Sequence, residues 1–293
     1  MRNKLKLEGI IPPVVVPFDE NGEVDYELFN EEIRRFMDTG VNGVAIGGST
    51  GEGYTLSDEE LRRLIEVAVN VRGGRKDFLI IAGIITNSVY QAVRRALLLK
   101  DLDVDALMIT PPHYLFNAGD EGNYLFYKEV YERTKLPIIV YNVIPWNVVS
   151  VDGVIAGVKQ SGGDIHALGE LLIRVRNIPI LTALDDMLFP SFVLGASGSI
   201  AAINTLLPRT SVRLFSAVAE GDYKIAREIH EELLPIAKAV IMQPDMPTRV
   251  KYVMNNAGWR VGYPRKPLPP MPPQGIISKL QEIAKQIQRL EGE

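Results

Sequence analysis

Lys159 has the sequence setting that most favours covalent chemistry. It stands in an apolar run, V-I-A-G-V-K-Q, typical of a buried strand, and lysine is seldom buried unless its amine is paired or used. By strand alternation, Lys159 shares a face with Ile155 and Gly157. If that face lines an interior, loss of water favours the neutral amine that Schiff-base formation needs. The alternative is a lysine that ends the strand and extends its amine to solvent.

The letters G-G-S-T-G-E, residues 47–52, follow a predicted strand and could hold an anion. Glycines let the backbone approach a ligand closely, and successive N–H groups form a nest for negative charge. Ser49 and Thr50 add hydroxyl donors, so the segment suits a carboxylate. The alternative is a capping box, in which Ser49 and Glu52 open a helical turn.

Three further positions have a chemical and a structural interpretation. Tyr141 ends the apolar run P-I-I-V-Y-N-V, where a phenol either relays protons or completes the core. Tyr114 follows T-P-P-H at the end of another strand and is either a hydroxyl at the mouth of a site or a surface aromatic. Gly195–Gly198, the letters G-A-S-G, either bind phosphate or form a tight turn between a helix and a strand.

Short apolar runs alternate with longer amphipathic segments over residues 1–221, and this pattern predicts the elements that position these residues. The runs are almost continuously apolar, as parallel strands covered on both faces are. The predicted strands are Ile10–Phe18, Gly43–Gly48, Phe78–Ile84, Ala106–Thr110, Pro137–Val143, Val154–Lys159, Pro179–Leu184 and Ser199–Ile203. The predicted helices are Tyr26–Asp38, Asp58–Val71, Val89–Lys100, Glu121–Thr134, Ile165–Val175, Met187–Leu194 and Arg209–Glu220, with Asp25, Ser57 and Ser88 as N-caps.

Eight β units that alternate with helices favour an α/β fold, a (β/α)8 TIM barrel. An open doubly wound sheet is the rival, but no G-x-G-x-x-G follows the first strand. We expect the barrel to occupy 1–221 and to carry the site. A C-terminal helical extension, 222–293, follows, with helices at Asp222–Ile241, Met246–Ala257 and Gln274–Leu290.

The connection between the fifth and sixth strands is unusually short. Only ten residues, I-P-W-N-V-V-S-V-D-G, separate Val143 from Val154. A parallel crossover normally takes a dozen or more residues and a helix. We therefore expect the helix between these strands to be shortened or missing.

The composition excludes several classes of function. The chain has 293 residues and a formal net charge of -4, so no basic excess indicates a nucleic-acid partner. It has no cysteine, and no two of its three histidines stand at the spacing of metal ligands, so the sequence predicts no cysteine-bound or histidine-rich metal site. No uncharged apolar stretch reaches the ~18 residues of a membrane span. We expect a cytoplasmic protein that binds neither nucleic acid nor membranes.

Together these motifs resemble the dihydrodipicolinate synthase / N-acetylneuraminate lyase family of class I pyruvate lyases and aldolases. The likeness covers nearly the whole chain and rests on the order and spacing of modest motifs. They are G-I-I-P-P-V-V-V-P-F (Gly9–Phe18), G-G-S-T-G-E (Gly47–Glu52), Y-N-V (Tyr141–Val143), G-V-K-Q-S-G-G-D (Gly157–Asp164) and L-G-A-S-G-S-I (Leu194–Ile200).

The resemblance implies a role for each matching residue. Lys159 matches the lysine that forms a Schiff base with pyruvate, and Tyr141 matches the tyrosine that relays protons. Ser49 and Thr50 match the hydroxyl pair that holds the pyruvate carboxylate and joins the relay. Tyr114 matches a tyrosine that reaches into a neighbouring subunit's site.

The same resemblance extends to the substrate pocket and the assembly. It places Gly48, Gly51 and Ile200 among the substrate-binding residues. The substrates are pyruvate, or another 2-oxo acid, and an aldehyde, and the reaction needs no metal or organic cofactor. The family is usually a homotetramer built as a dimer of dimers.

Two residues depart from the family pattern. Trp146 stands where synthases of dihydrodipicolinate carry an arginine for the distal carboxylate of the aldehyde, and an indole cannot make a bidentate carboxylate contact. This favours an apolar, aromatic or sugar-acid aldehyde. Gln160 stands where many relatives have an acidic residue.

The sequence is compatible with three hypotheses of function. The first is a pyruvate-dependent lyase or aldolase, either dihydrodipicolinate synthase-like or acting on 2-keto-3-deoxy sugar acids. The second is a catalytically silent relative that binds a 2-oxo acid. The third is a phosphate-binding barrel enzyme that uses Gly195–Gly198.

Overall fold

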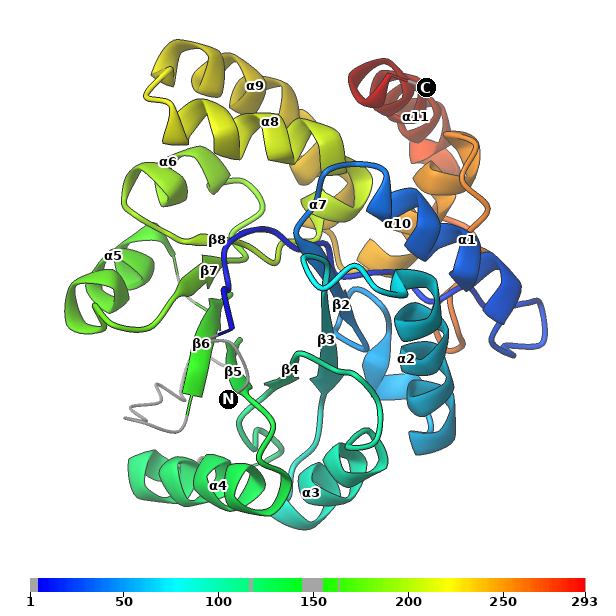
Figure 1. Ribbon diagram of the computed structural model, residues 1–293. Helices are drawn as coiled ribbons and strands as arrows, with labels where there is room; N and C mark the ends of the chain where they lie inside the picture. The colour runs from blue at the N-terminus through cyan, green and yellow to red at the C-terminus, as the bar shows by residue number, and fades with distance from the viewer. Residues whose placement is uncertain (1–4, 116–117, 144–154, 163, 293) are drawn as a thin grey trace.

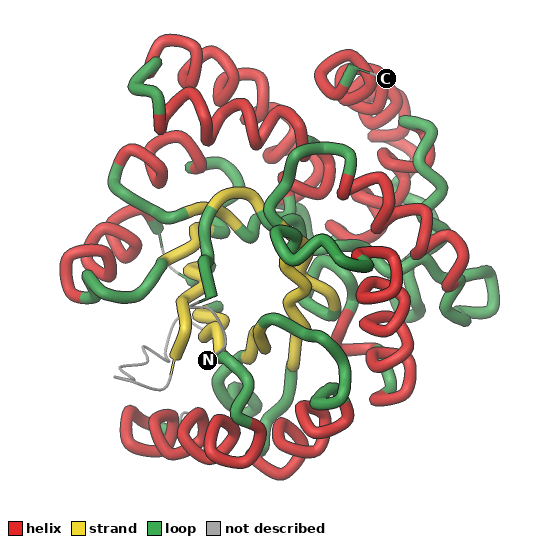
Figure 2. Tube along the Cα trace, viewed as in Figure 1, coloured by secondary structure: helices red, strands yellow, loops and turns green. Residues whose placement is uncertain are grey.

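Eight parallel strands surround the centre of the molecule, with helices outside them (Figure 1, Figure 2). The computed structural model describes residues 5–115, 118–143, 155–162 and 164–292. Neighbouring strands follow the order β1-β8-β7-β6-β5-β4-β3-β2. The strands are β1 (Gly9–Ile10), β2 (Gly43–Ile46), β3 (Leu79–Ile84), β4 (Ala106–Ile109), β5 (Ile138–Asn142), β6 (Ile155–Gln160), β7 (Ile180–Thr182) and β8 (Gly198–Ser199).

The chain just beyond β1 closes this sheet into a barrel. Val14 N donates to the Ala45 carbonyl of β2 at 3.0 Å, and Ala45 N donates to the Pro12 carbonyl at 2.9 Å. The (β/α)8 barrel is therefore confirmed. The predicted strand Ile10–Phe18 is too long, because the prolines of P-P-V-V-V-P have no N–H to continue the ladder.

Helices follow the strands along the chain and cover the outside of the barrel (Figure 1). They are α1 (Tyr26–Met37), α2 (Asp58–Arg72), α3 (Val89–Leu98), α4 (Gly119–Thr134), α5 (Ile165–Arg174), α6 (Leu188–Val193), α7 (Ile203–Leu206) and α8 (Pro208–Ala219), with a 3-10 turn, η1 (Gly53–Thr55), before α2. The predicted N-caps are confirmed: the side chains of Asp25, Ser57 and Ser88 accept hydrogen bonds from the first turns of α1, α2 and α3.

The last predicted strand, Ser199–Ile203, is wrong beyond its first residue. β8 ends at Ser199, and Ile203 begins α7. The reason is a contact from elsewhere in the chain, since Asp185 Oδ1 accepts a hydrogen bond from Ile203 N at 2.7 Å. This carboxyl satisfies a donor that the start of a helix leaves free.

The link between β5 and β6 lies mostly outside the described residues. β5 ends at Asn142 and β6 begins at Ile155. The predicted loss of a helix falls on residues 144–154, and so does Trp146. Both expectations stay predictions.

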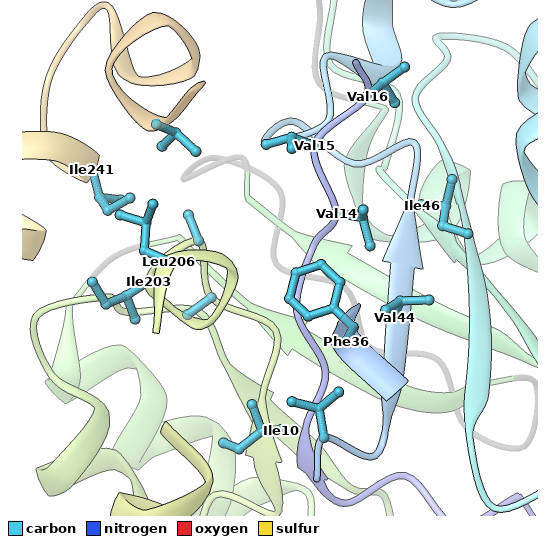
Figure 3. Packing of buried hydrophobic residues seen from close by; sticks show 14 of the residues in the cluster. Ile10, Val14, Val15, Val16, Phe36, Val44, Ile46, Ile203, Leu206 and Ile241 are labelled. Carbon is cyan, nitrogen blue, oxygen red and sulfur yellow. The ribbon is translucent and has the colours of Figure 1, made fainter. Parts of the chain in front are cut away.

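Two layers of apolar side chains hold the barrel together. The interior layer consists of Leu7, Ile11, Ala45, Leu79, Ile81, Ala106, Met108, Ile139, Tyr141, Leu181 and Ile200. The outer layer packs the opposite faces of the strands against helices, and Figure 3 shows Val44 and Ile46 of β2 in this layer with Phe36 of α1. The strands are thus buried on both faces, as their continuous apolar runs predict.

The C-terminal segment shares the outer layer of the barrel. It contains α9 (Tyr223–Ile236), a π-helical turn η2 (Ala237–Ile241), α10 (Met246–Asn256), a 3-10 turn η3 (Gln274–Ile276) and α11 (Ile277–Glu291). Ile241 lies in this layer with Ile203 and Leu206 of α7 (Figure 3). The division at 221/222 stays a prediction. In the described parts of the chain, no helix combines the length and apolar character needed to cross a bilayer.

Candidate active site

A bulge in β6 decides which of its side chains face the barrel interior. β5 and β6 pair Ile138 with Ile155 but Ile139 with Gly157, so Ala156 is an extra residue on β6. Ala156 packs against the interior layer, and a Cβ on Gly157 would meet that layer at 2.8 Å. Two successive residues therefore face inward, as a β-bulge allows.

The bulge turns Lys159 inward and Val158 outward. Val158 packs in a cluster with α5, whereas Lys159 pairs in register with Tyr141 and is only 3% exposed. The alternative of a solvent-extended lysine is therefore wrong. The shared face with Gly157 is confirmed, but the one with Ile155 is wrong, because the bulge lies between Ile155 and Lys159.

Lys159, Tyr141 and Ser49 form a chain of contacts across three elements. Lys159 Nζ lies 3.8 Å from the centre of the Tyr141 ring. The Tyr141 hydroxyl lies 3.2 Å from Ser49 Oγ, and either oxygen can donate the hydrogen bond. The three residues come from β6, β5 and the loop after β2, at the carboxyl ends of the strands, where barrel enzymes place their sites. An amine nucleophile beside a phenol can add to a carbonyl and exchange protons with the adduct.

The loop after β2 packs tightly against its neighbours, which explains its glycines. Gly47 has φ +81°, in the left-handed region. A Cβ on Gly51 would collide with the Val14 carbonyl, and one on Gly48 would approach the Met108 methyl at 3.2 Å. Packing against the chain beyond β1 therefore requires the glycine at Gly51, and the proposed role of Gly48 and Gly51 in substrate binding stays a prediction.

Glu52 does not cap a helix with Ser49. Its side chain is fully buried and forms an ion pair with Lys251, with Oε1 and Nζ 2.6 Å apart. The η1 turn begins at Gly53 without a side-chain cap. The capping-box interpretation is therefore wrong.

The other predicted site residues differ in how close they lie to this chain of contacts. Thr50 adjoins Ser49 and is buried. Ile200 lies in the interior layer with Tyr141, and its N–H donates to the Thr182 carbonyl at 2.9 Å. Tyr114 is 78% exposed, and its backbone N–H donates to Asn87 Oδ1 at 2.7 Å. Thr50 thus lies next to Ser49, Ile200 lies in the layer that contains Tyr141, and Tyr114 lies on the surface of the single chain.

Two other motif residues have structural partners. Gln160 accepts a hydrogen bond from Asn142 Nδ2 at 2.7 Å and donates to the Gly162 carbonyl, so it joins β5 to the loop after β6. In the segment 195–198, Ser197 N donates to the Ile180 carbonyl at 2.8 Å. This segment links α6 to β8, as a turn between a helix and a strand does, and the phosphate interpretation stays a prediction.

Asp185 is a carboxyl of the site that sequence reasoning missed. It follows β7, and burial raises its pKa from 3.8 to about 6, while the hydrogen bond from Ile203 N and the charge of Lys159 oppose that rise. The carboxyl thus lies close enough to Lys159 for the two charges to interact. The only signal in the sequence is a pair of aspartates, Asp185 and Asp186, at the end of an apolar run.

Asp185→Asn is expected to stabilise the protein at neutral pH. The folded state holds a proton on Asp185 up to about pH 6, whereas the unfolded chain releases it near pH 4, so stability falls as pH rises between these values. Asparagine keeps an oxygen for Ile203 N and avoids that loss, which amounts to at most about 3 kcal/mol. Thermal unfolding at pH 4 and pH 7.5 tests this. A gain in Tm that is the same at both pH values would contradict the assignment.

Comparison with known proteins identifies the family. The model of the Dihydrodipicolinate synthetase family matches residues 6–287. The 4-hydroxy-tetrahydrodipicolinate synthase of Methanocaldococcus jannaschii is 32% identical over 272 residues, which cover 89% of this chain and 92% of that protein.

Solved structures agree with this result. The crystal structure of dihydrodipicolinate synthase from Aquifex aeolicus has a TM-score of 0.85 and 30% identity, and the match covers 96% of this chain and 98% of that one. A catalytic lysine mutant of the sialic acid aldolase from Ruminococcus gnavus shares the fold, with a TM-score of 0.88 at 22% identity over 100% of this chain and 99% of that one. The chain therefore belongs to the dihydrodipicolinate synthetase family.

Proposed function

We propose that this protein is a carbon–carbon lyase that binds pyruvate, or a related 2-oxo acid, as a Schiff base on Lys159. The observation that carries the proposal is the buried Lys159 amine against the ring of Tyr141, whose hydroxyl contacts Ser49. Family membership supports the same reaction class. The silent-binder alternative has no observation in its favour among the described residues.

The reaction follows from these groups. The Lys159 amine attacks the C2 carbonyl carbon of pyruvate, and the adduct loses water to give an iminium. Tyr141 and Ser49 carry the protons that this addition and dehydration move. The iminium accepts the electron pair left when C3 loses a proton, which gives an enamine. The enamine carbon then forms a bond to the aldehyde carbon, whose oxygen takes up a proton, and the nitrogen becomes an iminium again. Water adds to this iminium and releases the product and the free amine.

We propose that the loop after β2 holds the pyruvate carboxylate. Ser49 and Thr50 supply hydroxyls there, and backbone N–H groups of Gly48 and Gly51 complete the site for the anion. The second substrate is an aldehyde without a distal carboxylate bound by arginine, since Trp146 occupies the position of that arginine in the family pattern. An apolar, aromatic or sugar-acid aldehyde fits this substitution.

Borohydride trapping tests the proposed function directly. Incubation with pyruvate followed by reduction is expected to add one reduced pyruvate to each chain, and mass spectrometry of peptides is expected to place it on Lys159. A screen of aldehydes with product analysis then identifies the second substrate. Failure of pyruvate and of other 2-oxo acids to form any adduct would refute the proposal.

We also propose that the protein assembles as a homotetramer built from dimers. Tyr114 and Leu115 are 78% and 66% exposed in the loop after β4. A second copy would cover these apolar side chains and bring Tyr114 towards a neighbouring site. Light scattering of the purified protein measures the assembly, and a monomer at micromolar concentration would contradict it.

A further inference from the structure

A buried ion pair ties the loop after β2 to the C-terminal segment. Lys251 of α10 and Glu52 are 1% and 0% exposed at their side chains, and Lys251 Nζ lies 2.6 Å from Glu52 Oε1. The same ammonium group donates to the carbonyls of Val16 and Tyr263, both at 2.7 Å. The second carboxylate oxygen of Glu52, Oε2, accepts a hydrogen bond from the backbone N–H of Arg265 at 2.8 Å. All three ammonium protons and both carboxylate oxygens therefore have partners.

Glu52 holds the turn that contains Ser49. Its N–H donates to the Ser49 carbonyl at 3.1 Å, and Gly53 N donates to the Gly48 carbonyl at 3.0 Å. Glu52 has φ +53°, and a residue with a Cβ pays a cost of about 1–2 kcal/mol for that left-handed conformation. The contacts of its side chain offset this cost and keep the turn in place. The position of the Ser49 hydroxyl thus depends on the Glu52 side chain.

Stability is a poor explanation for this pair. Removing two charges from water is costly, and apolar residues of similar size are often as stable. Burial lowers the pKa of Lys251 from 10.5 to about 8, although Glu52 opposes that decrease, so the fold bears a cost for keeping the ammonium charged. What the pair provides is direction, because the hydrogen bonds from Lys251 and from the Arg265 backbone fix both oxygens of the Glu52 carboxylate, at the end of the loop, relative to the C-terminal segment.

We infer that Glu52 and Lys251 are positioning residues, which hold Ser49 and the loop Gly48–Gly51 in the geometry that receives the carboxylate of the 2-oxo acid. The inference rests on the proposed function of this loop. It gives the C-terminal segment a part in substrate binding, although Lys251 is separated from Glu52 by 199 positions in the sequence.

Lys251→Met tests the inference. It removes the ammonium group and keeps an unbranched side chain. We expect the KM for pyruvate to rise on the order of 10- to 100-fold, because a small displacement of binding groups has effects of this size. The KM for the aldehyde is expected to stay within about twofold of that of the unmodified protein. Outside the loop, the hydrogen bonds of this pair reach only backbone groups of Val16, Tyr263 and Arg265. The rate of borohydride trapping at low pyruvate should fall, while saturating pyruvate restores it.

Arg249→Met is the matched control on the same helix. Arg249 forms an ion pair with Asp245 at 2.6 Å and donates to the Ala239 carbonyl, so its loss removes an ion pair of α10 that has no contact with the loop. We expect its KM for pyruvate to equal that of the unmodified protein. An equal rise in both variants would show a general effect of weakening α10 and would overturn the inference.

A second variant and a double variant keep the test decisive if Lys251→Met folds poorly. Glu52→Gln retains the shape of the side chain but places an amide N–H against either the Lys251 ammonium group or the Arg265 backbone N–H, which both donate to Glu52. The KM for pyruvate should therefore also rise. Combining both substitutions should cost little more than one, because they break the same contact. Folded variants with unchanged KM would refute this inference alone, whereas an unmodified protein that traps no 2-oxo acid would refute the proposed function.

Discussion

Lys159→Met is expected to abolish the trapping of pyruvate and to slow turnover on the order of 10⁴-fold or more, because the covalent intermediate cannot form without the amine. Methionine retains an unbranched side chain at a position that is only 3% exposed, so the barrel wall stays filled. Steady-state kinetics and mass spectrometry after borohydride reduction measure the two effects. Circular dichroism and Tm confirm that the variant is folded.

Lys251 provides the control for this experiment, since it is also a lysine buried in the described part of the chain. Lys251→Met should still form the adduct at saturating pyruvate, because its amine binds Glu52 and two carbonyls and does not react. An adduct that survives in Lys159→Met and disappears in Lys251→Met would exchange the roles of the two residues. The comparison therefore separates a reactive amine from a structural one.

Tyr141→Phe is expected to lower kcat by about 10²–10⁴-fold while leaving the Schiff base able to form. The substitution keeps the ring that lies 3.8 Å from Lys159 Nζ and removes only the hydroxyl that contacts Ser49. The steps that need proton transfer should become slower, whereas the contact between the ring and the Lys159 amine should be unchanged. The rate of adduct formation in a single turnover is compared with the steady-state kcat. A fall in kcat alone places the loss in the steps after Schiff-base formation.

Tyr127→Phe is the matched control for the loss of a buried phenol. The Tyr127 hydroxyl donates to the Ile109 carbonyl at 3.1 Å in the outer layer of the core. Its removal should cost about 1 kcal/mol of stability and leave kcat unchanged. A kcat for Tyr141→Phe equal to that of the unmodified protein would remove Tyr141 from the mechanism.

The regular elements were predictable because local pattern decides them. Continuous apolar runs marked the strands, and Ser57 marked the start of α2, where it forms both hydrogen bonds of a capping box with Glu60. The prediction was wrong where a distant group overrides the pattern. Ile203 reads as the end of a strand, but Asp185 caps it as the start of α7. β1 is shorter than predicted because the prolines after it have no N–H for the ladder, and the barrel closes there through the Val14 N–H and the Pro12 carbonyl.

Site residues with a local signal in the sequence were likewise predictable, and those that depend on distant contacts were not. Lys159 was identifiable as a cation in an apolar strand, and Ser49 as a hydroxyl in a glycine-rich loop, since both signals lie within a few residues. Glu52 and Lys251 were missed as a pair because 199 positions separate them, and an acidic residue in a loop is ordinary by itself. Asp185 was missed because its effect depends on burial beside Lys159, which only the folded chain creates.

The bulge at Ala156 makes the direction of the Lys159 side chain depend on the pairing of two strands. Deleting Ala156 would leave Tyr141 paired with Lys159 and the amine inside the barrel. A regular β6 that kept Ala156 would instead pair Tyr141 with Val158, and an isopropyl group would take the place of the amine. A slip of one residue in the pairing of β5 with β6 would therefore silence the chemistry without any change of sequence.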